Sequence, residues 1–187
     1  MFDYSKLIAV TNRLLCEGDF YKQIEKVCAL GPRSLILREK DLSDGEYEAL
    51  ALRVSEICGK NGVEFYIHSH IDIALKHGFK NIHLSIPALR ESKNRLGGFD
   101  SISVSCHSLD DVNLAQSAGA ARIVLGTVFE TACKEGLKGK GLGFVKEISE
   151  KTSLPVYAIG GITPQNLADV IAAGAAGGCM MSGFMKI

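Results

Sequence analysis

The chain has 187 residues, 47% of them hydrophobic, so it is long enough for one well-packed domain and short for two. We therefore expect a single domain over residues 1–187. Its 21 basic and 21 acidic side chains balance, which leaves no net field to recruit nucleic acid or an anionic membrane. No apolar run approaches the roughly 18 residues of a bilayer-spanning helix, so we expect no membrane partner.

The cysteines and the N-terminus indicate a reduced protein of the cytoplasm. The six cysteines are scattered and form no C-x-x-C pair, which argues against a zinc site or a disulfide framework. Several fall in apolar stretches, where a free thiol packs as a small hydrophobe. The first residues, MFDYS, lack the charged and apolar regions of a signal peptide. We therefore expect a cytoplasmic protein with no metal site.

Short runs rich in β-branched residues recur along the chain, and most are followed by a helical pattern. The alternation, at roughly 20–25 residues per unit, indicates parallel βα repeats. The predicted strands are Leu7–Thr11, Ser34–Arg38, Glu64–His68, Asn81–Leu84, Ser101–Ser105, Arg122–Gly126, Val156–Ile159 and Gly178–Met181.

The helices between these strands carry start signals. Ser43 with Glu46 forms a capping box at the start of the second helix. Thr163-Pro164 is the predicted N-cap and first residue of the helix after the seventh strand. Residues 86–98 have the least regular pattern, which predicts either a short helix or a loop.

Two architectures fit this order: a closed (β/α)8 barrel and an open doubly wound sheet. The count of eight favours the barrel, and T-N-R follows the first strand where a dinucleotide-binding fold has G-x-G-x-x-G. Such barrels typically run to ~250 residues, whereas this chain stops at Ile187, just after the eighth strand. We therefore predict a short TIM barrel whose last helix is reduced or absent. The apolar patch this leaves should be covered by a second copy, in a homodimer.

The turns after the seventh and eighth strands are candidates for a phosphate site. In TIM barrels the chemistry gathers at the C-terminal ends of the strands, and phosphate often binds after strands seven and eight. Gly160-Gly161 follows the seventh strand and Ser182-Gly183 follows the eighth. Adjacent glycines let backbone N–H groups approach an anion, and a helix N-terminus adds partial positive charge. The sequence therefore predicts a phosphate site at these two turns. The alternative is that the glycines serve only a tight strand-to-helix turn.

Basic side chains end at the same rim. Arg38 and Lys40 follow the second strand, and Lys134 lies in the long polar loop after the sixth. Each can pair with a phosphate oxygen. The alternative for Arg38 and Lys40 is a solvated charge run ahead of the next helix.

Four histidines lie at or near strand ends. For His68, His70 and His83 we favour a packing role, because they lack the carboxylate neighbours of a metal site. His107 differs, because it directly follows the fifth strand and its ring should face the barrel mouth. An imidazole at such a place is a natural proton shuttle, although the alternative is that it only helps to cap the next helix. We therefore take His107 as the candidate catalytic residue.

Four segments resemble the thiamine phosphate synthase superfamily, and the resemblance covers nearly the whole chain. It implies a TIM barrel in thiamine biosynthesis that binds a phosphorylated thiazole or thiamine phosphate. The segments are L-R-E-K-D-L-S at 37–43, I-D-I-A-L at 71–75, V-S-C-H-S-L at 104–109 and Y-A-I-G-G-I-T-P at 157–164.

The loop after the sixth strand favours the TenI branch of this superfamily. Residues 129–141 read F-E-T-A-C-K-E-G-L-K-G-K-G, where the synthases have T-x-T-K with its lysine on the pyrophosphate. The extended form resembles TenI-like proteins, which are thiazole tautomerases that isomerise carboxythiazole phosphate to its aromatic form. The resemblance implies that this loop folds over a phosphorylated heterocycle, that Lys134 adds its charge, and that His107 transfers the proton.

The chain departs from the synthases where they hold Mg²⁺. They have an N-D pair after the third strand and an acidic residue after the fourth, whereas this chain has His68-Ser69 and S-I-P-A at 85–88. A hard cation prefers carboxylate oxygens, so we expect no cofactor, and Mg²⁺ only if the protein is a synthase. Three activities stay open, in this order: a metal-independent thiazole phosphate tautomerase, a Mg²⁺-dependent thiamine phosphate synthase joining aminopyrimidine diphosphate to thiazole phosphate, and a non-catalytic regulatory protein that binds these phosphates.

Overall fold

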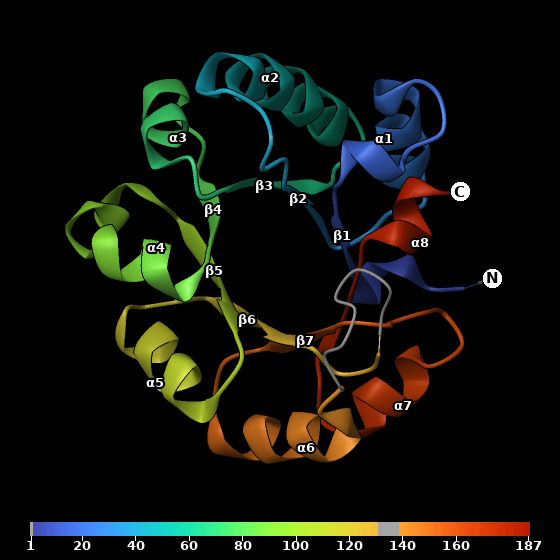
Figure 1. Ribbon diagram of the computed structural model, residues 1–187, viewed down its shortest axis with the longest axis vertical. Helices are drawn as coiled ribbons and strands as arrows, with labels where there is room; N and C mark the ends of the chain where they lie inside the picture. Colours follow the sequence, from blue (N-terminus) through green and yellow to red (C-terminus); the bar gives the residue numbers. More distant parts are fainter. Residues whose placement is uncertain (1, 131–138) are drawn as a thin grey trace.

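Eight parallel strands close into a barrel in the computed structural model, which describes residues 2–130 and 139–187 (Figure 1). Each strand pairs with the next one along the chain, and β8 pairs with β1. This arrangement confirms the predicted TIM barrel, and every predicted strand end lies within one residue of the observed one. The strands are β1 (Leu7–Val10), β2 (Ser34–Leu37), β3 (Glu64–His68), β4 (Asn81–Leu84), β5 (Ser101–Cys106), β6 (Arg122–Gly126), β7 (Val156–Ile159) and β8 (Gly177–Met180).

Helices surround the barrel on its outside (Figure 1). The predicted capping box of Ser43 and Glu46 is present at the start of α2. Within the described ranges, no helix combines the length and the apolar character that a membrane crossing requires. The α-helices are α1 (Phe20–Ala29), α2 (Asp44–Lys60), α3 (Ile71–His77), α4 (Ile86–Glu91), α5 (Leu109–Ser117), α6 (Gly141–Lys151), α7 (Leu167–Ala172) and α8 (Ser182–Met185), and shorter 3-10 turns are η1 (Tyr4–Lys6), η2 (Arg13–Leu15) and η3 (Lys93–Gly98).

The seventh helix begins later than the sequence predicts. It begins at Leu167 rather than at Pro164, because Thr163 and Asn166 close a separate turn ahead of it. The Thr163 N–H donates to Asn166 Oδ1 at 2.9 Å, and the Asn166 N–H donates to Thr163 Oγ1 at 3.3 Å. Asn166 Nδ2 also donates to the Gly161 carbonyl at 2.8 Å. This turn therefore holds the glycine pair at the end of β7.

The barrel has an inner and an outer apolar cluster, because alternate residues of a strand point to opposite sides. The outer cluster joins the strands to the helices and includes Tyr47, Leu35 and Ile123. The inner cluster fills the barrel and forms the floor of its C-terminal opening. Its buried members are Ile8, Val10, Ile36, Tyr66, Val124 and Cys179.

The last helix is reduced to one turn, as predicted, and the two ends of the chain meet there. Phe184 and Met185 of α8 are buried. The Tyr4 ring of η1 lies 6.0 Å from the Phe184 ring, and Gln23 of α1 donates a hydrogen bond from Nε2 to the Phe184 carbonyl at 2.7 Å. Segments from both termini thus lie side by side between α1 and α7 (Figure 1). The chain itself covers part of the apolar surface left by the short helix.

The described cysteines are free thiols, and most of them pack in the interior. Cys28 of α1 and Cys58 of α2 are both buried, with their Sγ atoms 3.8 Å apart. Cys106 and Cys179 are buried in β5 and β8. These four thiols pack as the sequence predicts, and Cys133 lies outside the described residues.

Candidate functional site

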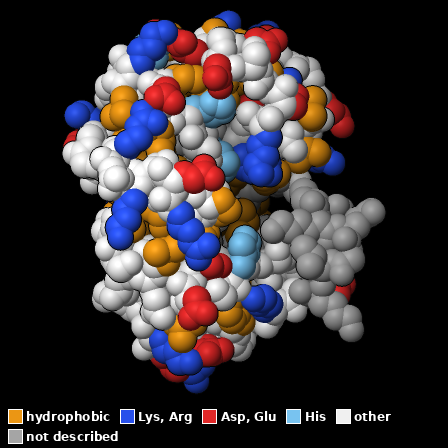
Figure 2. Space-filling view, turned by 60° about the vertical axis from the view of Figure 1, so that its left-hand side comes forward, with side chains coloured by type: hydrophobic (Ala, Val, Ile, Leu, Met, Phe, Trp, Pro, Cys, Tyr) orange, Lys and Arg blue, Asp and Glu red, His pale blue; other side chains and the backbone are white. Residues whose placement is uncertain are grey.

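A cavity of about 1260 Å³ opens at the C-terminal end of the barrel. In Figure 2, basic and histidine side chains gather around a hollow with an apolar floor. Lys134 lies outside the described residues. The other predicted site residues all line this cavity: Arg38, Lys40, His107, Gly160, Gly161, Ser182 and Gly183.

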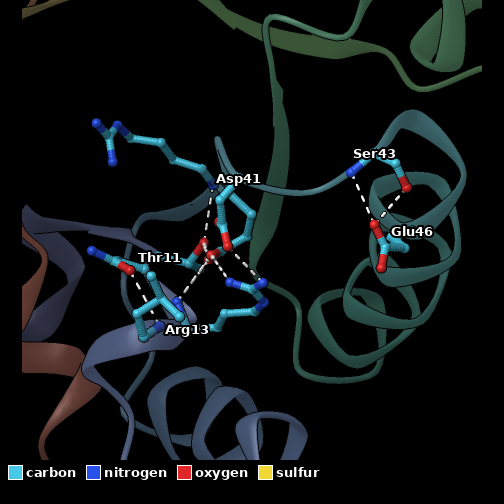
Figure 3. Close-up of polar contacts among 9 residues, drawn as sticks. Thr11, Arg13, Asp41, Ser43 and Glu46 are labelled. Atoms are coloured by element: carbon cyan, nitrogen blue, oxygen red, sulfur yellow. Dashed lines mark hydrogen bonds and ion pairs between the residues drawn. The ribbon is translucent and has the colours of Figure 1, made fainter.

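A buried hydrogen-bond network joins the ends of β1 and β2 (Figure 3). Thr11 Oγ1 donates to Glu39 Oε1 at 2.6 Å and accepts the Arg38 N–H at 2.9 Å. The Arg13 N–H lies 3.0 Å from both carboxylate oxygens of Glu39, and the Arg13 guanidinium pairs with Asp41 at 2.7 Å. Burial raises the pKa of Glu39, and the hydrogen bonds from Thr11 and Arg13 oppose that rise. The network fixes the backbone from which Arg38 enters the cavity.

Arg38 and Lys40 bring positive charge to the cavity without an acidic partner. Among the described residues, neither side chain forms an ion pair, and the nearby Asp41 is taken by Arg13. Burial, and then the charges of Arg38 and Lys40, lower the pKa of His68 to about 4. Burial, helped by the two cations, therefore keeps His68 neutral near pH 7, and both cations can bind an anionic ligand.

His83 has the packing role that the sequence favours. Its ring is buried, with Nδ1 2.9 Å from Ser103 Oγ and Nε2 2.7 Å from Ser105 Oγ. Burial, helped by the charges of His68 and Arg122, holds its pKa well below the usual value. A neutral imidazole with both nitrogens bonded has no free group for a proton transfer.

The rim after β3 is built on a left-handed residue. Ser69 has φ 63°, and its N–H donates to the His83 carbonyl at 3.0 Å. The His70 ring stacks on Tyr47 with centroids 3.7 Å apart, and His70 Nδ1 lies 3.3 Å from Asp44. This turn holds His70 against α2, with its ring engaged by two partners.

His107 uses one ring nitrogen in a hydrogen bond, and its other ring nitrogen has no partner among the described residues. Its Nδ1 lies 2.8 Å from the Gly126 carbonyl, which can only accept, so Nδ1 carries the proton and Nε2 is left as the acceptor. The His107 N–H donates to Asp111 Oδ2 at 2.8 Å, and Lys140 Nζ donates to the His107 carbonyl. These bonds fix the backbone and the ring together. The arrangement can take a proton at Nε2 and return it.

The Gly160-Gly161 turn requires glycine at both positions. Gly160 has φ 104° and Gly161 has φ 64°. A Cβ at Gly160 would lie 2.5 Å from Thr127 Cγ2, and one at Gly161 would lie 2.7 Å from Phe129 Cβ. The turn thus packs against the segment after β6 and leaves its backbone open to the cavity. At the end of the neighbouring strand β8, α8 begins at Ser182, whose N–H has no acceptor within its own helix.

The donors at the cavity do not fit a magnesium site. Glu39 is the acidic residue of the described lining, and both of its oxygens are taken by Thr11 and Arg13. Ser69 and Ser85 line the cavity where a carboxylate would be expected. No cluster of three acidic, histidine or cysteine side chains with metal-binding geometry occurs in the parts of the chain described. Mg²⁺ prefers carboxylate oxygens, and within the described lining both oxygens of Glu39 are already engaged.

Four residues that hold this site are not predicted from the sequence: Thr11, Glu39, Lys140 and Asn166. Thr11 and Glu39 are buried polar residues at strand ends, which is a signal that a partner lies nearby. Lys140 lies in the polar segment 129–141, and nothing in the sequence distinguishes it from the other lysines of that segment. Asn166 stands three residues after Thr163, at the spacing of a reciprocal cap.

The family model and the sequence relatives agree on one family. A family model described as thiamine monophosphate synthase matches residues 7–184. "Putative thiamine-phosphate synthase 2" of Aquifex aeolicus (strain VF5) is 35% identical over 187 residues, which cover 97% of this chain and 98% of that one. The thiamine-phosphate synthase of Clostridioides difficile (strain 630) is 34% identical over 87% of this chain and 79% of its own. In fold, the chain resembles thiamine phosphate pyrophosphorylase from Pyrococcus furiosus, with a TM-score of 0.81, 23% identity, and coverage of 98% of this chain and 88% of that one.

Proposed function

We propose that this chain, which belongs to the thiamine-phosphate synthase family, is a thiazole phosphate tautomerase that needs no metal. Its substrate would be the non-aromatic form of carboxythiazole phosphate, and its product the aromatic form. The observation that carries the proposal is His107, whose Nδ1 bond to the Gly126 carbonyl leaves Nε2 as a free base at the cavity. The carboxylate-poor rim supports it further, because this reaction transfers only a proton.

In the proposed reaction, His107 moves one proton between two positions of the substrate. Nε2 takes a proton from the non-aromatic ring, and the electron pair of the broken bond moves into the ring as it becomes aromatic. The imidazolium then returns the proton elsewhere on the substrate, so that no atom or electron is gained or lost. The Gly126 carbonyl holds Nδ1–H throughout and stabilises the imidazolium.

The substrate phosphate would lie between the glycine turn and Arg38 and Lys40, which form no ion pair with any described residue. Gly160-Gly161 keeps the backbone open to the cavity, and Arg38 and Lys40 supply charge at its rim. The start of α8 offers the N–H groups of Ser182 and Gly183. A crystal grown with thiamine phosphate tests this placement. Phosphate density against the glycine turn supports it, and density elsewhere in the cavity contradicts it.

Thiamine phosphate synthase is the second candidate, and the names of the relatives favour it. Proteins from several organisms that are 30–35% identical to this chain carry that name. One assay separates the candidates: both substrate sets are supplied, with and without a chelator. A tautomerase converts carboxythiazole phosphate in the chelator, whereas a synthase forms thiamine phosphate only with Mg²⁺. A binding protein turns over neither set but retains the phosphates.

We further propose that the protein is a homodimer. Leu14 of η2 is 72% exposed and Ile187 is 46% exposed, and η2 lies beside the short α8. These side chains belong to the exposed apolar surface beside the short α8, where a longer last helix would lie. A second copy of the chain could bury this surface instead. Sedimentation equilibrium supports the dimer if the mass is twice that of the chain, and a monomer at micromolar concentration contradicts it.

A further inference from the structure

A second cavity, of about 320 Å³, lies at the opposite end of the barrel from the mouth. Its lining comes from the N-terminal parts of the strands and the residues just before them, among them Glu64 of β3 and Arg122 of β6. β6 has five residues, so Arg122 lies ~13 Å along the strand from Gly126, which binds His107. The proposed tautomerase chemistry uses none of this lining.

Arg122 is buried in this cavity with most of its hydrogen-bond donors unused. The residue is 5% exposed, and its guanidinium lies 3.9 Å over the Tyr66 ring. One nitrogen, Nη2, donates to Ser34 Oγ at 2.9 Å. Nε has no hydrogen-bond partner among the described residues, and Nη1 is 4.0 Å from Glu64, too far for a hydrogen bond. A buried guanidinium whose N–H groups have no acceptor lowers the stability of the fold, unless a ligand accepts hydrogen bonds from them.

The surrounding groups favour an anion over a neutral acceptor. Arg33 and Arg122 line the cavity with Glu64 as the acidic member, which leaves a net charge of +1 within the described lining. Glu64 lies between the two cations, with Oε1 3.4 Å from Arg33 Nη2 and Oε2 4.0 Å from Arg122 Nη1, so its single charge is shared by both. A water molecule would fill the gap without balancing this charge.

A further donor points to an oxygen ligand. Tyr66 Oη and Ser101 Oγ lie 2.8 Å apart, and whichever of them donates, the other keeps a hydrogen free. Both residues line the same cavity as Arg122. A guanidinium and a hydroxyl together match the two oxygens of a carboxylate.

We propose that this cavity, at the N-terminal end of the barrel, binds a small monocarboxylate through Arg122. The singly charged ligand neutralises the excess of one positive charge. Its oxygens accept from the free edge of the guanidinium and from the Tyr66–Ser101 hydroxyl pair. Arg33, whose side chain is 54% exposed, stands at the solvent side and attracts the anion.

The test is the thermal unfolding midpoint of the full chain in acetate, compared with chloride at equal ionic strength. We expect acetate at several times its dissociation constant to raise the wild-type midpoint by ~2–4 °C over chloride. The increase should vanish in Arg122→Met and shrink in Arg33→Gln. It should persist in Lys60→Gln, which removes an equal charge at the C-terminus of α2, and in Arg38→Met, which alters only the mouth.

Several results would overturn the proposal. These are equal midpoints in acetate and chloride for the wild type, and an acetate effect that survives Arg122→Met. A loss in Arg38→Met instead would place the anion at the mouth, and equal losses in Arg33→Gln and Lys60→Gln would reduce the effect to general charge. If Arg122→Met does not fold, the acetate effect on the unfolding midpoint can still be compared between Arg33→Gln and Lys60→Gln. A smaller effect in Arg33→Gln supports the site, and equal effects contradict it.

Discussion

At the scale of single residues, the site depends on buried polar groups that hold other groups in place. Thr11 is fully buried, yet its hydroxyl is used twice, as a donor to Glu39 and as an acceptor for the Arg38 N–H. Glu39 in turn fixes the backbone of Arg13. None of these groups needs to touch the ligand, because they set the position of Arg38, the cation that we propose binds the phosphate.

Replacement of Thr11 tests this network. Thr11→Val keeps the shape but removes the hydroxyl, which leaves the Glu39 carboxylate and the Arg38 N–H each without one partner. We expect the free energy of unfolding, measured with urea, to fall by ~1–3 kcal/mol. Phosphate binding should weaken as well, because Arg38 is no longer fixed. Thr11→Ser keeps the hydroxyl and should lose much less, and equal losses in both variants would contradict the network.

His68 should make the protein sensitive to acid. Its pKa is lowered to about 4 by burial and by the charges of Arg38 and Lys40, from an ordinary value of 6.5. Between these values the unfolded chain binds more protons than the folded one, so stability falls as the pH drops from about 6.5 towards about 4. His68→Gln should flatten this fall in urea titrations at several pH values. An unchanged pH slope would show that His68 has an ordinary pKa in the folded protein.

At the scale of elements, the strand ends and the turns after them determine which groups line the cavity at the mouth of the barrel. β6 and β7 lie next to each other, and the segment after β6 packs on the Gly160-Gly161 turn. The Phe129 N–H donates to the Gly160 carbonyl at 3.0 Å, which joins the two segments directly. The shape of the proposed phosphate site therefore depends on close contact between two backbones.

Two glycines with similar φ angles allow the cost of losing this contact to be measured separately from the cost of backbone strain. Gly161 and Gly78 have φ 64° and φ 69°, but a Cβ at Gly78 meets nothing within 4 Å. Gly78→Ala should lower the free energy of unfolding by ~1–2 kcal/mol, the strain of the left-handed region. Gly161→Ala should lose clearly more and also weaken phosphate binding, because its Cβ would lie 2.7 Å from Phe129 Cβ. Equal losses and intact phosphate binding in both variants would contradict the tight packing.

The strands could be predicted from the sequence, whereas the side-chain network of the site could not. Runs such as Arg122–Gly126 are β-branched and bounded by polar or small residues, so a local pattern determines them. The start of α7 was wrong by three residues because the Thr163–Asn166 turn resembles a helix cap. Thr11 and Glu39 are 28 residues apart, and only the pairing of β1 with β2 brings them together. Local patterns carry no information on such a contact.

At the scale of the whole molecule, the barrel closes although its last helix is one turn long. Phe184 of α8 is 1% exposed and packs near Tyr4, and Gln23 binds its carbonyl. This arrangement makes a residue near the end of the chain part of the core. The short helix also leaves the cavity mouth bordered by α8 and by Ile187.

Truncation of Phe184 tests the role of this closure. Phe184→Ala should lower the free energy of unfolding by ~3–5 kcal/mol, the usual loss for a buried phenylalanine. Lys186→Ala, at an exposed position directly after α8, should change it by ~0.5 kcal/mol or less. Urea unfolding measures both. A loss below ~1 kcal/mol for Phe184→Ala would mean that α8 is not part of the cooperative core.

The most direct test of the proposed function is the rate of carboxythiazole phosphate isomerisation in a chelator, for the wild type and for His107→Ala. We expect the wild type to be active without metal, and His107→Ala to lose ~10²–10⁴ in rate while substrate binding stays nearly unchanged. His77→Ala, at a histidine on α3 outside the cavity lining, should keep the full rate. An undiminished rate in His107→Ala, or a wild type that makes thiamine phosphate only with Mg²⁺ and isomerises nothing, would contradict the account.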